Sequence, residues 1–136
     1  MEQMRYGFSM RVALGYEQAV ERIRQALQQQ GFGVLTEIDV RQVMREKRVV
    51  EFRPYVILGA CNPQFAHQAL EAELDLGLLL PCNVVVYAEE GGSVIEAMDP
   101  ELLVRIVGNP SLEPIAKEVK QRLQQAIKQA AEGAPL

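Results

Sequence analysis

The chain has 136 residues, of which 49% are hydrophobic and 24% are charged, and its formal net charge is −4. These totals are those of an ordinary globular domain, and they exclude a chain that is disordered over most of its length. The acidic balance argues against a general nucleic-acid binder, because such a protein needs a basic face to displace counterions from phosphates.

The N-terminal part predicts a strand. Apolar residues alternate over residues 6–14, YGFSMRVAL, which is the period of a half-buried strand. The length of the chain predicts a single domain over 1–136, with its core in 6–130 and a frayed tail at 131–136.

A helix, a second strand and a short helix are expected next. Over residues 16–30 the apolar residues recur at helical spacing, and Gly31 follows as a natural residue beyond a helix end. A strand is expected at 32–38, and Asp39 can cap a short helix over 40–47. The stripe of that helix is formed by Val40, Val43, Met44 and Lys47.

Positive charges gather around the short helix. We interpret this cluster as a solvated helix face and loop, with an anion or nucleic-acid site as the alternative. Its members are Arg41, Arg45, Lys47, Arg48 and Arg53.

A central strand and a helix are predicted after this cluster. Residues 55–61, YVILGAC, form an almost continuous apolar run, which is typical of a strand buried on both faces. Asn62 is a favoured N-cap, and Pro63 at the first helical position loses no needed hydrogen bond. The buried stripe of the helix is expected to be Ala66, Ala69, Leu70 and Leu74, with Phe65 beside it.

The C-terminal half predicts a hairpin followed by helices. Strands at 82–88 and 93–98 are joined by EEGG, whose glycines can adopt the positive φ of a tight turn. A short helix is expected over 100–106, and Ser111 is expected to cap a long amphipathic helix.

This order, β-α-β-β-α-β-β-α, predicts an α+β fold. We expect a sheet rich in antiparallel pairs with helices packed mainly on one face. A doubly wound parallel sheet is disfavoured, because no glycine-rich turn follows any of the expected strands.

The chain's two cysteines stand in similar motifs, GACNP at residues 59–63 and PCNV at 81–84. Cys61 precedes the N-cap of a helix, where the unpaired backbone N–H groups can lower a thiol pKa. The structural alternative is that Cys61 packs as a small hydrophobe against Ala66. Free thiols favour a reducing, cytoplasmic setting.

A Cys–His pair and a metal site are both disfavoured. His67 is the only histidine, and it lies more than a helical turn beyond Cys61, so we expect it on the polar face. Zinc would need at least one ligand beyond Cys61, His67 and Cys82, and the spacing is not that of a zinc knuckle. We therefore expect no metal and no cofactor.

A redox pair of Cys61 and Cys82 depends on how the strands run. If a simple crossover makes them parallel, the cysteines fall at opposite ends of the sheet, about 20 Å apart for six residues of strand. That distance is far too long for a disulfide, unless the apolar link LGLLLP runs back across the sheet or a second subunit closes the gap, so a redox pair is the less favoured hypothesis. Asn62, Asn83 and the backbone of Gly59 could instead line a small polar pocket.

The sequence resembles the bacterial and archaeal domain of unknown function 302 family over residues 6–130. The segments that carry the resemblance are YVILGACNP at 55–63, AHQAL at 66–70 and LGLLLPCNVVVY at 76–87. The resemblance implies a compact α+β domain with an antiparallel sheet and a long C-terminal helix, broadly similar to the TATA-binding protein. It implies no activity, because fold does not fix function.

The same resemblance gives weight to the two cysteine motifs as the place of a site. Its signature positions are Cys61, Asn62, Pro63, Pro81, Cys82 and Asn83, and more weakly Lys47. We expect a cytoplasmic homodimer that binds a small molecule or partner near these positions and binds neither nucleic acid nor a membrane. The alternative is a thiol-dependent enzyme or redox protein that uses Cys61.

Overall fold

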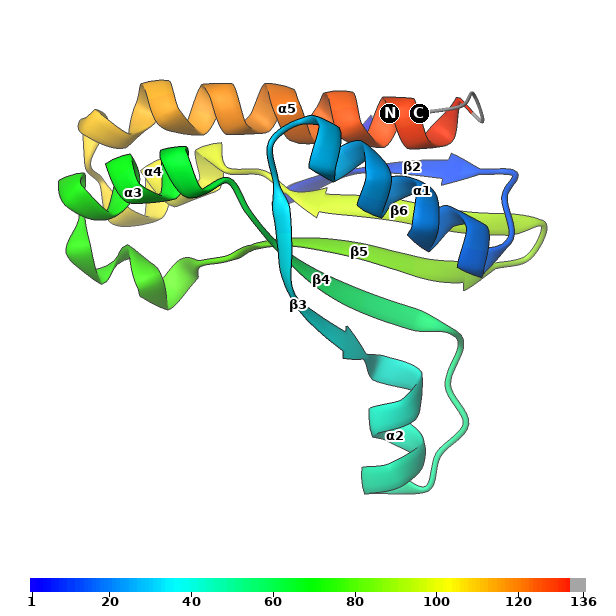
Figure 1. Ribbon diagram of the computed structural model, residues 1–136. Helices are drawn as coiled ribbons and strands as arrows, with labels where there is room; N and C mark the ends of the chain where they lie inside the picture. The colour runs from blue at the N-terminus through cyan, green and yellow to red at the C-terminus, as the bar shows by residue number, and fades with distance from the viewer. Residues whose placement is uncertain (133–136) are drawn as a thin grey trace.

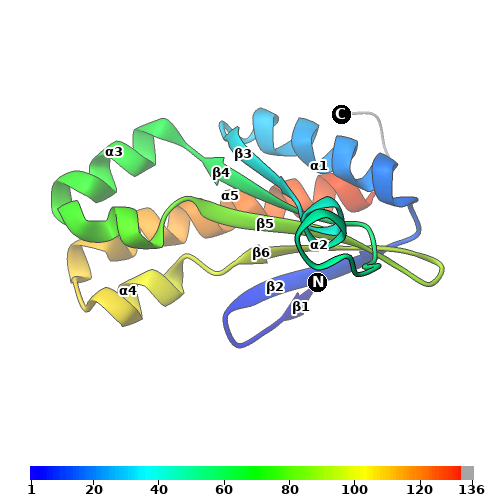
Figure 2. The same cartoon turned by 90° about the horizontal axis from the view of Figure 1, so that it is seen from below.

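A six-stranded antiparallel sheet forms the body of the protein in the computed structural model, which describes residues 1–132 (Figures 1 and 2). In spatial order its strands are β1 (Glu2–Gln3), β2 (Gly7–Val12), β6 (Gly92–Met98), β5 (Cys82–Glu89), β4 (Tyr55–Cys61) and β3 (Gly33–Asp39). The predicted α+β class and antiparallel sheet are confirmed. The short β1 was not expected, because two residues carry no detectable period.

Two long helices, α1 (Tyr16–Gln29) and α5 (Glu113–Ala131), cover one face of this sheet (Figure 1). Their apolar stripes meet side chains from alternate positions of the strands, so helices do pack mainly on one face. The largest fully buried residues of this core include Phe8, Ile23, Leu27, Leu58, Ile95, Leu123 and Ile127.

The opposite face, called the bare face below, is left uncovered by α1 and α5 (Figure 2). It carries Tyr55, Ile57, Val85 and Tyr87, which are half-buried, whereas their neighbours in sequence on β4, Val56 and Leu58, are buried. The prediction that β4 is buried on both faces is therefore wrong for the isolated chain. The side chains on both faces of β4 are apolar, which makes the run continuous, but helices cover only the face that carries Val56 and Leu58.

Helix α2 (Val40–Arg48) projects from the sheet on the side of the bare face (Figures 1 and 2). Asp39 caps it as predicted, accepting a hydrogen bond from the backbone N–H of Gln42 at 3.0 Å. The expected stripe on this helix is not buried, since α2 contains no buried residue.

The remaining helices lie beyond the end of the sheet where β4 finishes (Figure 1). They are α3 (Pro63–Ala72), α4 (Glu101–Val107) and the 3-10 helices η1 (Leu74–Leu79) and η2 (Pro110–Leu112). Leu74 is 81% exposed, contrary to expectation, because α3 ends before it. Ser111 lies within η2 and donates its backbone N–H to Asn109, so the first turn before α5 is capped there and not by Ser111.

The link from β4 to β5 returns to the end of the sheet from which it leaves. Helix α3 runs about 15 Å outward at 1.5 Å per residue, and η1 returns about 12 Å at 2.0 Å per residue. β4 and β5 are consequently antiparallel neighbours. The prediction that Cys61 and Cys82 lie at opposite ends of the sheet is wrong, because it assumed a parallel crossover.

Within residues 1–132, no helix has the length and apolar character needed to cross a membrane. Of the tail expected to fray, Ala131 is the last residue of α5, and residues 133–136 lie outside the described part of the chain.

Candidate functional site

The two cysteine motifs form one structural unit on the paired strands β4 and β5. In the register of these strands Gly59 lies opposite Asn83, and Ala60 lies opposite Cys82. A side chain at Gly59 would collide with Thr36 and with the ring of Pro81, so the glycine lets the strand and the second motif pack closely. GACNP and PCNV therefore meet in space as two sides of one contact.

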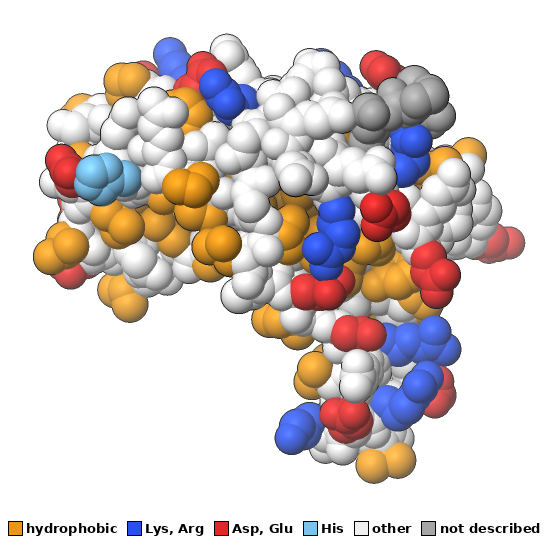
Figure 3. All heavy atoms as spheres, viewed as in Figure 1, with side chains coloured by type: hydrophobic (Ala, Val, Ile, Leu, Met, Phe, Trp, Pro, Cys, Tyr) orange, Lys and Arg blue, Asp and Glu red, His pale blue; other side chains and the backbone are white. Residues whose placement is uncertain are grey.

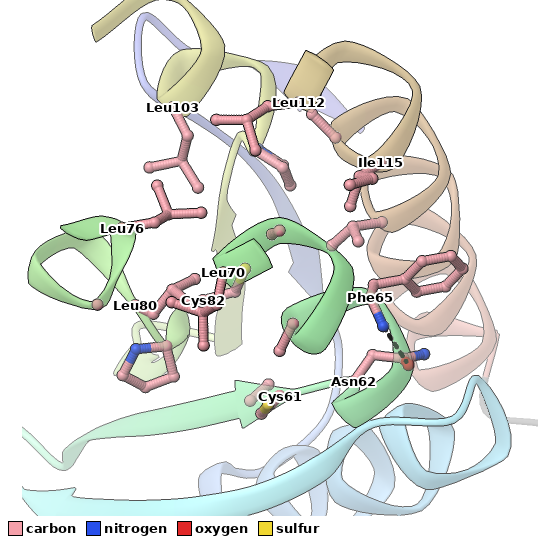
Figure 4. A pocket seen from close by; sticks show the side chains of 18 of the residues that line it. Cys61, Asn62, Phe65, Leu70, Leu76, Leu80, Cys82, Leu103, Leu112 and Ile115 are labelled. Atoms are coloured by element: carbon pink, nitrogen blue, oxygen red, sulfur yellow. Dashed lines mark hydrogen bonds between the residues drawn. The ribbon is translucent and has the colours of Figure 1, made fainter. Parts of the chain in front are cut away.

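Asn62 and Pro63 start helix α3 as the sequence predicted. Asn62 Oδ1 accepts a hydrogen bond from the backbone N–H of Phe65 at 3.5 Å (Figure 4). The Asn62 side chain is held in place because the residue is only 9% exposed and its amide packs against Gly31, which has a φ of +87°. The cap thus fixes the position of Cys61, the residue immediately before it.

A cavity of about 320 Å³ lies between this unit and the helices beyond the sheet (Figure 4). Its walls come from α3, η1, α4 and the first turns of α5, and Cys61, Asn62 and Cys82 belong to its lining. The other main lining residues are Phe32, Leu35, Phe65, Ala69, Leu70, Leu76, Leu80, Leu103, Val104, Leu112, Ile115 and Val119.

Almost all of this lining is aliphatic or aromatic. Leu76, Leu103 and Leu112 converge from three separate elements on one side of the cavity, and Cys61 and Asn62 lie on the other (Figure 4). Leu35 is 66% exposed and Gly77 is exposed, so the cavity reaches solvent beside β3 and η1. Figure 3 shows hydrophobic side chains gathered over α3 and η1. The expected small polar pocket is instead a mainly apolar one.

Burial determines the acidity of both thiols. Desolvation raises the pKa of Cys61 above its ordinary value of 9.0. The pKa of Cys82 is raised to about 11, mainly by burial and to a smaller extent by the nearby Cys61 thiol. The direction for Cys61 is opposite to the lowering that the N-terminus of α3 was considered to cause, because burial disfavours the charged thiolate.

The comparisons with known proteins agree with this arrangement. The family model described as "Domain of unknown function DUF302" matches residues 8–130. The chain belongs to this family. A crystal structure of an uncharacterized conserved DUF302 protein from Bacillus stearothermophilus is similar, with 35% sequence identity and a TM-score of 0.87. The match covers 93% of the present chain and 99% of the other. None of the curated proteins matches.

Three of the predicted site residues of this DUF302 domain do not line the cavity. Pro63 is exposed at the start of α3, Asn83 is exposed on β5, and Lys47 is exposed on α2. Lys47 is also far from the motifs along the sheet, because α2 precedes the start of β4 and the motifs lie at its end.

His67 lies on the polar face of α3, as predicted. Its side chain is 76% exposed, and its Nε2 lies 2.8 Å from Glu71. Among residues 1–132 of the DUF302 domain, no three side chains of histidine, cysteine, aspartate or glutamate gather closely enough to hold a metal ion.

The half of the cavity that comes from the C-terminal helices was not predicted from the sequence. Leu103 and Val104 fall within the short helix expected over 100–106, Ile115 falls within the long C-terminal helix, and Leu35 falls within the strand expected at 32–38, but no pattern in the sequence marked any of them as a site residue. The one available signal was LGLLLPC, where apolar residues exceed what a single short helix can bury. The DUF302 domain uses this excess to build the wall formed by η1.

Side-chain contacts fasten α5, which supplies one wall. Arg122 donates to the backbone oxygen of Gln30 at 3.1 Å and stands 5.2 Å from the ring centre of Phe65. Further along, Lys120 Nζ lies 3.0 Å from Asp99 Oδ2, and the Asp99 side chain is only 5% exposed. These contacts hold α5 against α1, α3 and the start of α4.

Proposed function

We propose that this DUF302 domain binds a small, mainly apolar molecule in the cavity beside Cys61 and Cys82. The cavity itself carries the proposal, since ligand sites are concave, largely apolar and supplied with a few polar groups. Asn62 and the two thiols are the polar groups available to orient a ligand. Proteins seldom keep an apolar space of this volume without use, because unfilled space costs packing energy.

The volume supports a ligand larger than a single ring. An engineered apolar cavity of about 150 Å³ in another protein accepts benzene. The present cavity of about 320 Å³ is roughly twice as large. Its lining offers no fixed charge, which favours a neutral aromatic or short aliphatic molecule over an anion.

Thermal denaturation in the presence of benzene and of indole tests this proposal. At tenfold excess over Kd, a ligand that binds only the folded state stabilises it by about 1.4 kcal/mol, or about 5 °C in Tm for a domain of this size. Ala69→Leu and Ala116→Leu place extra atoms in the cavity and are expected to abolish the shift. Ala72→Leu, at the exposed last residue of the same helix and outside the cavity lining, is the matched control and should retain the shift. An unchanged shift in both filled variants would refute binding in this cavity.

The alternative of a thiol-dependent enzyme has a different kind of support. The pairing of β4 and β5 brings the two cysteine motifs to one end of the sheet, as a dithiol site would require. The raised pKa of both thiols disfavours the thiolate that such chemistry needs. Ligand binding is therefore the function that the geometry supports better.

A further inference from the structure

The bare face and helix α2 together form an unpartnered surface. Tyr55 lies opposite Tyr87, Ile57 lies opposite Val85, and Ile38 lies opposite Ile57, so these side chains share the bare face. The rings of Tyr55 and Tyr87 stack with their centres 5.4 Å apart, and Ile38 is 47% exposed. This apolar strip runs across β3, β4 and β5, the part of the sheet next to α2.

Helix α2 gains little burial from the rest of the chain, and only Val40, Arg41 and Met44 are half-buried. It has nine residues and buries none of them, whereas isolated helices shorter than about 12–15 residues are marginal in water. Apolar side chains are exposed along it and just after it: Val43 is 41%, Val49 is 90% and Val50 is 44% exposed. Such a projecting element is expected to be covered in the functional assembly.

The charges of α2 indicate what covers it. The helix contains four basic residues and one acidic residue, a net charge of +3, in a chain whose total is −4. The rest of the chain therefore carries −7. The basic side chains of the projecting helix are visible in Figure 3. A surface that combines exposed leucines with acidic groups would match it.

Such a surface exists at the other end of the same strands. The end of α3 and η1 carry Glu71, Glu73 and Asp75 beside Leu74 and Leu78, which are 81% and 88% exposed. Strand β4 starts at Tyr55 and ends at Cys61. Helix α2 lies near its start, and the acidic surface lies beyond its end.

We propose that the bare face binds a second copy of this chain, with α2 of each copy docked on the acidic η1 surface of the other. A two-fold axis lying across the strands exchanges their two ends, so the contact between α2 and η1 forms twice. Packed sheets lie about 10 Å apart, and nine helical residues extend about 14 Å, so α2 is long enough to reach past the facing sheet. The proposal does not rest on ligand binding in the cavity. It also places Lys47 at the partner's η1, which lines the cavity.

Sedimentation equilibrium of the full chain at increasing concentration and salt tests the proposal. We expect a dimer that weakens as salt rises, because the paired charges lie at the rim of the interface. The triple variant Arg45→Glu, Lys47→Glu, Arg48→Glu is expected to weaken the dimer about tenfold or more, because it replaces attraction by repulsion in both copies of the contact between α2 and η1. Because α2 buries no residue, the core is left intact, and circular dichroism checks this.

Reciprocal variants make the test specific. Glu71→Lys with Asp75→Lys should weaken the dimer by itself and restore it when combined with the reversed α2 charges. Lys117→Glu with Lys128→Glu alters two exposed cations of α5, away from the bare face, and should leave association unchanged. A chain that stays monomeric up to near-millimolar concentration, or a dimer insensitive to the α2 and η1 reversals, overturns the proposal.

Discussion

Raising the pH should destabilise the protein through Cys82, a residue that lies at the cavity wall. The folded state raises the pKa of this thiol from 9.0 to about 11, first through burial and second through Cys61. Two pKa units correspond to about 3 kcal/mol at 1.36 kcal/mol per unit. Cys82 is only 8% exposed, so solvent screens little of this effect. The stabilisation is fully present below pH 9 and is lost as pH rises towards 11, because the unfolded thiol ionises first.

Urea unfolding of the reduced protein at a series of pH values measures this loss. Between pH 9 and 11 the contribution of Cys82 has a slope of at most about −1.4 kcal/mol per pH unit. Tyr16, Tyr55 and Tyr87 also have raised pKa values, chiefly through burial, and they add a slope of the same sign. The comparison must therefore be between variants.

Cys82→Ala should be less stable than the natural chain at pH 8 but should lose stability more slowly above pH 9. Cys61→Ala is the matched control, because Cys61 is only half-buried and its removal should flatten the curve less. Parallel curves for the natural chain and Cys82→Ala would show that the Cys82 thiol ionises normally in the folded protein. The reasoning about burial at the cavity wall would then be refuted.

Three substitutions test the contacts that position the cavity, each by urea unfolding at pH 7. Lys120→Met leaves the carboxylate of Asp99 buried without its cation and should cost about 3 kcal/mol. Asn62→Ala removes the cap of α3 and should cost about 1 kcal/mol. Gly59→Ala forces a methyl group against Pro81 and should cost about 2 kcal/mol through overpacking.

A control substitution for each variant separates the loss of the named contact from the effect of changing the residue type. Lys117→Met removes a cation whose side chain is 63% exposed and should be almost neutral. Asn62→Asp keeps a capping oxygen and should retain most of the stability. Gly77→Ala adds a methyl group where no atom lies within 4 Å, so a cost equal to that of Gly59→Ala would contradict the packing argument.

The local signals in the sequence predict most elements of this fold. Alternation located β2, helical spacing located α1, and EEGG located the hairpin of β5 and β6, where Gly91 has a φ of +85°. Each of these features is determined by residues close together in the sequence, so the sequence is sufficient to predict it. The broad likeness to the TATA-binding protein stays a prediction, as do the cytoplasmic location and the absence of nucleic-acid binding.

The direction of the link between β4 and β5 could not be read in the same way. It depends on whether α3 lies back over the sheet or runs beyond its end, which is decided by packing against α4 and α5. That single choice decided where Cys82 lies relative to Cys61. The chain identified Asn62 and both cysteines as candidates for the site, but the apolar walls that make a cavity of it come from residues distant in sequence.

The close contact between Gly59 and Pro81 has an evolutionary consequence. A methyl group at position 59 has no room while Thr36 and the proline ring stand over it, so the three positions share one volume. A lineage could enlarge one of them only after reducing another. In an alignment of related chains, positions 36, 59 and 81 should accordingly change together, and the two short motifs should be inherited or lost as a pair.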